Sequence, residues 1–343
     1  MAKPERIKLI EEIQKERGSR LLTYVTSARQ NLEIQMAMDS IRKIFDHLKS
    51  VKNAKKSGKI DLFLHSNGGD GTVPWRLVTL IREYADRFCV LVPYKAFSAA
   101  TLTALGANEI VMHPMGMLGP TDPTVTNPFN PPDPQNPARL AGISVEDVTA
   151  YIALIKEDAG IHHEDELVQA FKLLAERVHP LALGNVKRSL SQSRMMARKL
   201  LALHMSKSED EHKIEEIVDS LTSKLFYHGH PINRREAKEQ IGLRTVVDPP
   251  SKIEKLMWDL YLQYETEMKL EQPFMQAHEF VAQIPNPNPQ GEVTPSITTK
   301  LVYVESDNRS DVFTLEYQIR GVPSPTGGVQ TQLLTARQSW QTE

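Results

Sequence analysis

The stretch KIDLFLHSNGGDG, residues 59–71, decides the fold of this chain because an apolar run leads into a sharp glycine turn. The run Ile60–His65 predicts a buried strand, and Gly68 and Gly69 allow backbone angles that are closed to other residues. Residues 74–88 then read as a helix, which opens with Pro74 near its first position, where a missing N–H costs little. A strand, a tight turn and a helix in this order form one unit of an α/β fold.

The same order repeats immediately downstream. Residues 90–93 predict a second strand, the turn KAFSAAT follows at 95–101, and a helix is expected from Ser98 to Gly106. Residues 109–112, EIVM, predict a third strand. Continuous apolar strands that alternate with helices indicate a parallel sheet covered on both faces.

The rest of the chain adds helices and a small β region. Helices are expected at 4–17, 31–49, 144–205, 209–225 and 251–268, with a strand at 21–26. A Pro- and Asn-rich linker at 284–289 precedes the runs KLVYVE (300–305) and VFTLEY (312–317), which flank a turn and predict a hairpin. We therefore expect an N-terminal helical and strand arm at 1–55, a core with a helical insertion at 56–250, a helical extension at 251–282, and a linker with a C-terminal β-hairpin appendage at 283–343.

Composition limits the function classes. The chain has 343 residues, of which 40% are apolar and 24% charged, so it is long and apolar enough to bury a large core. A net charge of -2 provides no pull toward nucleic acid, and no nucleic-acid partner is expected. The single cysteine, Cys89, rules out an internal disulfide and a cysteine-based zinc cluster. The charged N-terminus and the lack of a span-length apolar segment predict a cytoplasmic protein.

Two consecutive strand ends carry the residues that point to chemistry. The carboxyl ends of parallel strands meet at one edge of a sheet, where sites form. Gly68 and Gly69 let a substrate carbonyl approach the backbone, and Ser98 lies in the first turn of the next helix. The N–H groups of Gly69 and Ala99 would then stabilise the oxyanion of an acyl transfer. Each feature alone is more often structural, since a helix-opening serine is usually an N-cap.

Together, the surrounding strings indicate a family. HSNGGD (65–70), VPYKAFSAATL (92–102), LGANEIVM (105–112) and LGPTDP (118–123) resemble the serine dehydrogenase proteinase family, which is similar to signal peptide peptidase A and more distantly to ClpP. The likeness continues through HPLALGNV (179–186) and HGHPINR (228–234). The chain departs from the family pattern at Ala100, where glycine is usual, and at Asn108, where aspartate is usual.

The resemblance implies a fold and a set of roles. The fold would be the ClpP/crotonase-like α/β fold of repeated β-β-α units, with helical additions and the small C-terminal β appendage. Ser98 would be the nucleophile, Gly68 and Gly69 the oxyanion turn, and Ala99 the second oxyanion donor. No cofactor or metal is implied.

A serine nucleophile also needs a general base. ClpP-like sites use a histidine downstream of the serine, but residues 119–123, GPTDP, contain none, and His113 reads as a strand-end residue. Relatives of signal peptide peptidase A use a lysine farther downstream, which implies Lys156. Such a lysine must be neutral, and Lys156 follows apolar residues on a predicted helix. Lys95 and Lys187 are the alternatives.

The leading hypothesis is a serine peptidase with a Ser-Lys dyad, acting on peptides or unfolded protein segments. Relatives assemble, so a homo-oligomer is expected. A separate ATPase or membrane partner is possible, because the phosphate-loop pattern Gly-x4-Gly-Lys-Ser/Thr is absent. Two other hypotheses stay open: a crotonase-type acyl-thioester enzyme, and a catalytically silent peptide-binding or assembly scaffold. His228 and His230 alone are too few to predict a metal site.

Overall fold

A computed structural model of the protein describes residues 2–49, 57–134, 136–206, 208, 210–223, 229–285, 291–324 and 329–343. The chain divides into two compact units, Met1–Met117 with Arg244–Glu343, and Leu118–Leu243. The first unit contains the large sheet and the second is mainly helical. In the described ranges, no helix combines the length and the apolar character that crossing a membrane requires.

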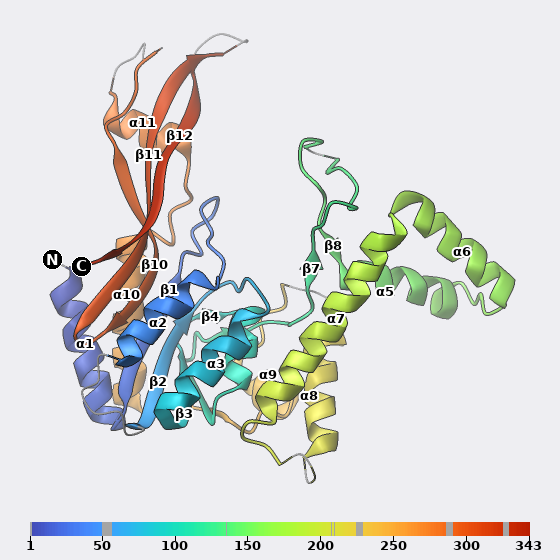
Figure 1. The fold of residues 1–343 in the computed structure, drawn as a ribbon, viewed down its shortest axis with the longest axis horizontal. Coiled ribbons are helices and arrows are strands. Elements are labelled where there is room, and N and C mark those ends of the chain that lie inside the picture. Colours follow the sequence, from blue (N-terminus) through green and yellow to red (C-terminus); the bar gives the residue numbers. More distant parts are fainter. Residues whose placement is uncertain are drawn as a thin grey trace. The chain divides into compact units, whose positions relative to one another are not determined.

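The sheet of the first unit is the scaffold of the fold. Eight strands among the described residues pair in the order β12-β11-β10-β1-β2-β3-β5-β9 (Figure 1). Five of them are parallel: β1 (Arg20–Thr26), β2 (Ser57–His65), β3 (Ala85–Val92), β5 (Glu109–Met112) and β9 (Val246–Val247). The other three form an antiparallel meander: β10 (Ile297–Ser306), β11 (Arg309–Pro323) and β12 (Val329–Thr342). The predicted parallel α/β sheet is therefore confirmed.

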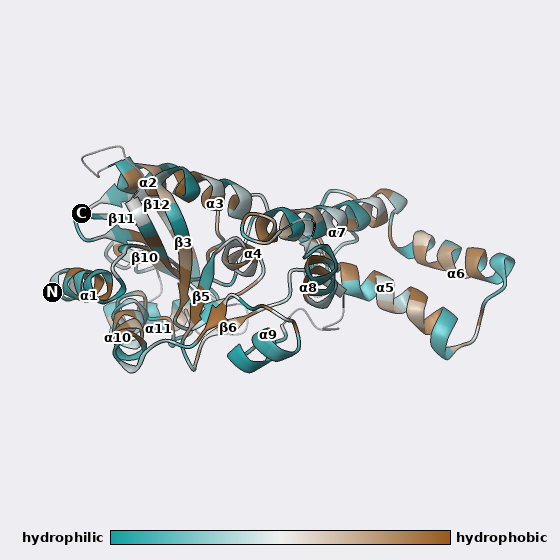
Figure 2. Ribbon diagram, turned by 90° about the horizontal axis from the view of Figure 1, so that it is seen from below, coloured by the Kyte–Doolittle hydropathy of each residue, from teal (hydrophilic) through white to brown (hydrophobic). Residues whose placement is uncertain are grey.

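Helices cover both faces of this sheet. α1 (Ala2–Arg17) and α10 (Ser251–Met268) lie on one face, and α2 (Asp39–Lys49) and α3 (Val73–Tyr84) lie on the other (Figure 2). Neighbouring side chains of β2 point to opposite faces, yet Leu62, Phe63 and Leu64 are all fully buried. A strand can be apolar throughout only where both faces are covered, which is the property that made this region recognisable.

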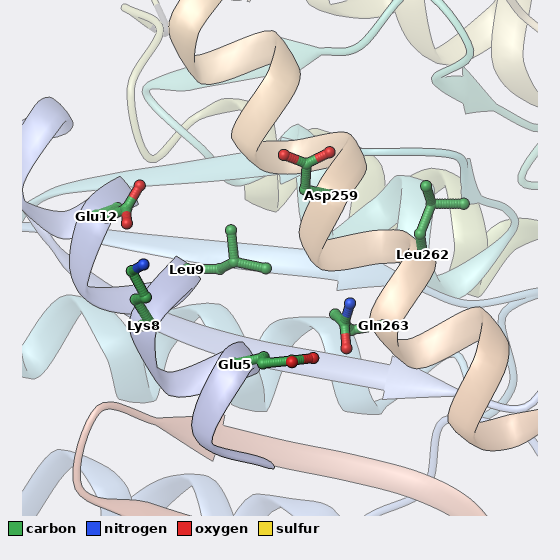
Figure 3. Close-up of a pocket in the computed structure, with 7 residues that line it drawn as sticks. All are labelled: Glu5, Lys8, Leu9, Glu12, Asp259, Leu262 and Gln263. Carbon is green, nitrogen blue, oxygen red and sulfur yellow. The ribbon is translucent and has the colours of Figure 1, made fainter. Parts of the chain in front are cut away.

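A shallow pocket of about 330 Å³ lies between α1 and α10 (Figure 3). Most of its charged lining is acidic, with one lysine, and the lining residues are Glu5, Lys8, Leu9, Glu12, Asp259, Leu262 and Gln263. It contains no nucleophile and none of the residues that the sequence singles out, so it is a groove between two packed helices.

Two helix predictions differ from the structure in length. The helix expected at 31–49 begins only at Asp39, because Met36 forms a backbone bridge with Gly69 in place of helical hydrogen bonds. The helix expected at 74–88 ends at Tyr84, because Ala85–Val92 pairs with β2 as a strand. In both places, the need to pair the backbone in the sheet overrides a helical spacing of apolar residues.

The expected C-terminal hairpin is formed by β10 and β11, and β10 continues the central sheet by pairing antiparallel with β1. β12 and α11 (Gln276–Gln283) were not expected. The Arg6 side chain of α1 donates to the Glu305 carboxylate of β10 at 2.8 and 3.0 Å. The expected boundary at 55 and 56, and most of the linker at 284–289, lie outside the described residues.

The second unit contains the helices expected at 144–205 and 209–225. They are α5 (Val145–Ala153), a π-helical turn η1 (Leu154–Asp158), α6 (Glu164–Arg177), α7 (Pro180–Leu201) and α8 (Glu211–Ser223), followed by α9 (Arg234–Glu239). Two short strands, β7 (Thr124–Val125) and β8 (Ile143–Ser144), pair ahead of α5. Ser144 caps α5, and its Oγ accepts from the Glu146 N–H at 3.0 Å, as its position predicts.

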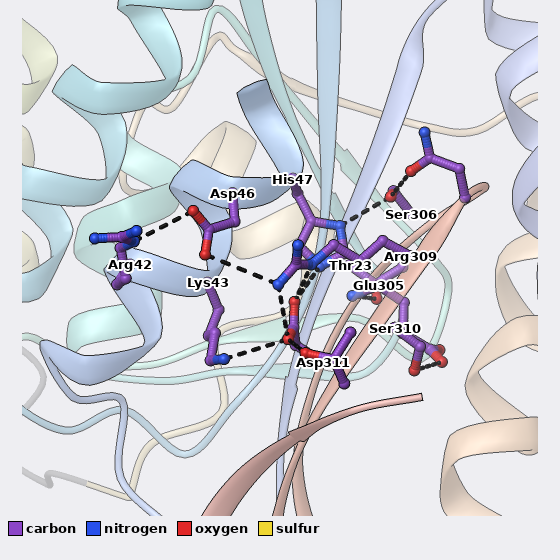
Figure 4. A network of polar contacts seen from close by, with 12 residues as sticks. Thr23, Arg42, Lys43, Asp46, His47, Glu305, Ser306, Arg309, Ser310 and Asp311 are labelled. Atoms are coloured by element: carbon purple, nitrogen blue, oxygen red, sulfur yellow. Dashed lines mark hydrogen bonds and ion pairs between the residues drawn. The ribbon is translucent and has the colours of Figure 1, made fainter. Parts of the chain in front are cut away.

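A buried polar network joins α2 to the C-terminal strands (Figure 4). His47 Nδ1 lies 2.8 Å from Ser306 Oγ, and His47 Nε2 lies 3.2 Å from the Asp311 carboxylate. Arg309 and Lys43 also pair with Asp311, at 2.5 and 3.4 Å. Burial lowers the pKa of His47 to about 4, although the charge of Asp311 opposes this.

This network predicts that acid destabilises the fold. From pH 6.5 down to about 4, His47 binds a proton in the unfolded chain but not in the folded one. Stability should therefore fall as the pH is lowered through this window, by up to about 3 kcal/mol from His47. Urea unfolding at pH 7 and pH 4.5 measures it. His47→Gln should flatten the pH dependence, whereas His212→Gln, on an exposed face of α8, should not. An unchanged pH dependence in His47→Gln contradicts the assignment.

Candidate active site

Ser98 has an unusual backbone conformation. It has φ 51° and ψ -112° and immediately precedes α4 (Ala99–Leu105). A positive φ at a residue other than glycine costs on the order of 1–3 kcal/mol and persists only where neighbouring contacts impose it. Its hydroxyl caps nothing and makes no hydrogen bond to the described residues. The ordinary N-cap role, which Ser144 fills at α5, is therefore absent at Ser98.

The segment before Ser98 is held against the end of β2. The short strand β4 (Lys95–Ala96) runs beside Ser66, whose N–H donates to the Lys95 carbonyl at 2.9 Å. The Phe97 N–H donates back to the Ser66 carbonyl at 3.0 Å. After the turn, the Leu102 N–H donates to the Ser98 carbonyl at 3.0 Å and starts the helix. These bonds on both sides fix the strained residue.

The glycine turn lies directly on this serine. Gly68 has φ 101°, and a Cβ added there would be 2.8 Å from both the Phe97 carbonyl oxygen and Ser98 Cβ. The same Cβ position is 3.2 Å from the Ala99 nitrogen. Only glycine permits this approach, so the structure brings Gly68, Ser98 and Ala99 together as the sequence predicts.

The loop at 31–38 holds the other side of the turn. The Met36 N–H donates to the Gly68 carbonyl at 2.8 Å, and the Asp70 N–H donates to the Met36 carbonyl at 3.0 Å. Peptide bonds in the described chain are trans, so the Gly69 N–H points opposite to the Gly68 carbonyl and away from Met36. Gly69 has φ 152°, and a Cβ there would be only 2.4 Å from the Met36 nitrogen.

Two backbone N–H groups are consequently available at the turn. Gly68 donates its N–H to Ser66 Oγ at 3.0 Å. The N–H groups of Gly69 and Ala99 donate to no acceptor within the described ranges. An N–H pair left without acceptors beside a serine is what stabilisation of a tetrahedral oxyanion requires.

The histidines near the site are structural. His65, at the end of β2, is buried, and its Nδ1 accepts from the Lys95 N–H at 3.3 Å. Burial, together with the charge of Lys95, lowers the pKa of His65 to about 3, so it is neutral at ordinary pH. His113 stacks on Trp258 with ring centroids 4.9 Å apart and accepts from the Met115 N–H, as a strand-end residue.

The three candidate lysines occupy different settings. Lys156 lies in the second unit, exposed on η1, and shares a pocket of about 300 Å³ with mostly apolar side chains of α5, η1 and α6. Lys95, in the first unit, is half-buried, with its ammonium 5.0 Å from the centre of the Tyr94 ring. Lys187 is exposed on α7. Lys156 and Ser98 thus belong to different units, and their pairing stays a prediction.

The histidine pair at 228 and 230 is described only in part. His230 Nε2 lies 2.6 Å from the Glu236 carboxylate. The side chain of Asn233 caps α9 close by, so His230 contacts the first turn of that helix. His228 lies outside the described residues.

Comparison with known proteins assigns this chain to a family. Residues 2–194 match the family of ClpP-like SDH-type serine proteinases. The chain belongs to this family. The match includes the glycine turn, Ser98 and Lys156, and it ends within α7, before the strands β10–β12. The fold of this family member is accordingly ClpP-like.

Individual relatives are more distant. Two uncharacterised proteins of Methanocaldococcus jannaschii are each 24% identical, over 262 and 261 residues, which are 76% and 75% of this chain and 77% and 79% of theirs. Among solved structures, two variants of the membrane-bound stomatin-specific protease 1510-N are similar to this chain. The first shares 13% identity over 64% of this chain and 76% of its own. The second shares 15% identity over 66% of this chain and 90% of its own. Their TM-scores are 0.33 and 0.24, so the family assignment rests on the sequence match.

Three residues that shape the site in this proteinase were not identified from the sequence. Met36 lies in a segment whose apolar spacing resembles a helix, and nothing there signals a backbone bridge. Ser66 and Thr26 are buried hydroxyl residues at or just after the ends of β2 and β1. The only sequence signal for Ser66 is a hydroxyl at a strand end just before a glycine pair, and Thr26 has no glycine beside it.

The turn predicts a sharp difference between two neighbouring glycines. Gly69→Ala places a methyl group against the Met36 backbone, so we expect a loss of at least about 2 kcal/mol in unfolding free energy. Gly71→Ala is the matched control, because a Cβ there meets nothing within 4 Å, and it should change stability by under about 0.5 kcal/mol. Urea denaturation midpoints measure both. Equal effects of the two substitutions contradict the described turn.

Proposed function

We propose that this chain is a serine peptidase that hydrolyses peptides or unfolded protein segments through an acyl-enzyme on Ser98. The observation that carries the proposal is the position of Ser98, which has a strained backbone and a hydroxyl that does not cap α4. It lies beside two N–H groups without acceptors among the described residues, those of Gly69 and Ala99. A structural serine would use its hydroxyl to cap α4. A nucleophile needs its hydroxyl free to reach a substrate carbonyl.

The chemistry follows from these groups. Ser98 Oγ attacks the carbonyl carbon of the scissile peptide bond while its proton passes to a general base. The carbonyl oxygen becomes an oxyanion, which accepts hydrogen bonds from the N–H groups of Gly69 and Ala99. The base returns the proton to the leaving amine as the C–N bond breaks. Water then attacks the acyl-enzyme by the same route and releases the second product.

Lys156 is the base that we propose. It follows buried Ile155 on the π-helical turn η1, and such turns are frequent at functional sites. Its pocket is lined mostly by apolar side chains, among them Ile152, Leu167, Val168 and Phe171, together with the acidic Glu164. A lysine must be neutral to accept a proton as a base. Lys156 is exposed in the chain alone, so a bound peptide or a second copy would have to cover it. Lys95 and Lys187 are the alternatives.

We also propose that the protein forms homo-oligomers. α6 has no buried residue, and its apolar side chains Val168, Phe171 and Leu173 are 61%, 50% and 61% exposed. A helix in water draws most of its stability from burial of its apolar side, so a covering surface is needed here. Any unfolding motor, or a membrane partner, would be a separate protein.

The nucleophile is tested by labelling with a fluorophosphonate, followed by intact-mass measurement. We expect one adduct per chain in the wild type and none in Ser98→Ala. Ser144→Ala is the matched control, because Ser144 also precedes a helix but uses its hydroxyl as a cap, and this variant should label normally. A folded wild type that takes no adduct would favour a silent scaffold or a crotonase-type enzyme over a peptidase.

The base is tested by replacing each lysine with methionine and measuring kcat on an unstructured fluorogenic peptide. Lys156→Met should lower kcat by at least about a hundredfold, because the serine then lacks a proton acceptor. Lys95→Met and Lys187→Met should retain kcat within about threefold, as expected for residues outside the reaction. If Lys156→Met keeps full activity and Lys95→Met or Lys187→Met loses it, the lysine whose replacement abolishes activity is the general base.

A further inference from the structure

Two buried hydroxyl groups that take no part in the proposed chemistry contact the glycine turn. Ser66 directly follows β2, and Thr26 is the last residue of β1. Both are fully buried. Because β1 and β2 are neighbouring parallel strands, their carboxyl ends bring these two side chains together beneath the turn.

The hydrogen bonds of Ser66 use the whole capacity of its hydroxyl. A serine hydroxyl offers one donor and two acceptor positions. Ser66 Oγ accepts from the Thr26 hydroxyl at 2.8 Å and from the Gly68 N–H at 3.0 Å. Its own proton is directed to the Gly68 carbonyl, 3.4 Å away. Thr26 therefore determines which way the Ser66 hydroxyl points.

This arrangement sets the direction of the peptide between Gly68 and Gly69. Ser66 contacts both the N–H and the carbonyl of Gly68, and Met36 holds the same carbonyl from outside. Gly68 has no Cβ and could otherwise rotate to several backbone conformations. Since the Gly69 N–H belongs to the peptide that carries the Gly68 carbonyl, holding that carbonyl also aims the Gly69 N–H.

We propose that Thr26 and Ser66 are positioning residues that act as a hydroxyl relay for the oxyanion turn. The relay occupies the Gly68 N–H and leaves the Gly69 N–H as the donor that acts with Ala99. This inference rests on the proposed peptidase function. Neither hydroxyl touches the substrate, and their effect passes through the orientation of one peptide group.

Isosteric variants separate the hydroxyl from the side-chain shape. Thr26→Val keeps the shape and removes the donor, while Thr26→Ser keeps the donor and removes a methyl group. Ser66→Ala removes the centre of the relay. We expect kcat to fall about tenfold in Thr26→Val and about a hundredfold in Ser66→Ala, with KM within about twofold, because a misdirected donor fails mainly in the transition state. Thr26→Ser should stay close to the wild type.

A second measurement reports the oxyanion turn directly. A peptidyl trifluoromethyl ketone adds to Ser98 Oγ and places an oxyanion at the two donors. Its affinity should weaken by the same factor as kcat/KM in each variant, whereas the affinity of an uncleaved peptide, measured in the Ser98→Ala background, should not change. A merely structural role would alter both affinities together.

Hydrogen exchange of residues 66–70 supplies a readout that is independent of catalysis. Exchange should accelerate in Thr26→Val and Ser66→Ala but not in Thr26→Ser. The relay is overturned if Thr26→Val and Ser66→Ala change neither the exchange rate nor kcat in an otherwise active enzyme. It is also overturned if Thr26→Val and Thr26→Ser lose kcat equally. If exchange accelerates as expected while wild-type Ser98 takes no fluorophosphonate, the failure belongs to the proposed peptidase function.

Discussion

Gly68 and Gly69 lie between two backbones, and the site depends on how closely these segments approach. On one side, Gly68 lies against Phe97 and Ser98, and on the other, Gly69 lies against Met36. A side chain at either position would overlap with neighbouring atoms, so only glycine fits there. Both glycines have positive φ angles, and hydrogen bonds fix the peptide between them. The backbone strain lies at Ser98, whose positive φ costs on the order of 1–3 kcal/mol and has to be offset by the surrounding structure. The benefit is that the N–H donors and the serine are oriented before a substrate binds.

The C-terminal strands support this geometry although they lie beyond the family match. β10 pairs with β1 so that Val302 is opposite Thr26, which ends beside Ser66. The Glu305 carboxylate of β10 accepts from Arg6, and from the hydroxyls of Tyr264 and Ser310 at 2.7 Å each. A buried ion pair contributes little net stability, but with its carboxylate so fully bonded it can select one arrangement of strands. The meander therefore braces β1 and does more than extend the chain.

Two polar clusters near the turn between β10 and β11 differ in their chemistry. Arg6 stays charged, because its hydrogen bonds to the Glu305 carboxylate outweigh burial and hold the pKa of Arg6 above its usual value. His47, beside Ser306 and Asp311, is instead driven neutral by burial. The His47 cluster therefore ties the attachment of α2 to pH.

Much of the fold could be predicted because its parallel strands are continuously apolar and end in recognisable turns. Ser98 and the glycine pair stand at two such ends, so their proximity follows from the topology of a parallel sheet. Met36 could not be placed, since the spacing of Leu32 and Met36 fits a helix and a backbone bridge leaves no mark on side-chain pattern. β12 was missed for a related reason: much of its length is exposed, so its sequence carries no clear apolar alternation.

The sequence by itself determined the α/β class, the positions of the glycine turn and of Ser98, and the membership of a serine proteinase family. These depend on local properties, namely strand apolarity, the conformational range of glycine and the order of motifs along the chain. Only the tertiary structure decided that Ser98 caps nothing, that the Gly68 N–H is occupied by Ser66, and that Thr26 reaches the same turn. Hydrogen-bond partners far apart in the chain are set by packing, which no local pattern encodes.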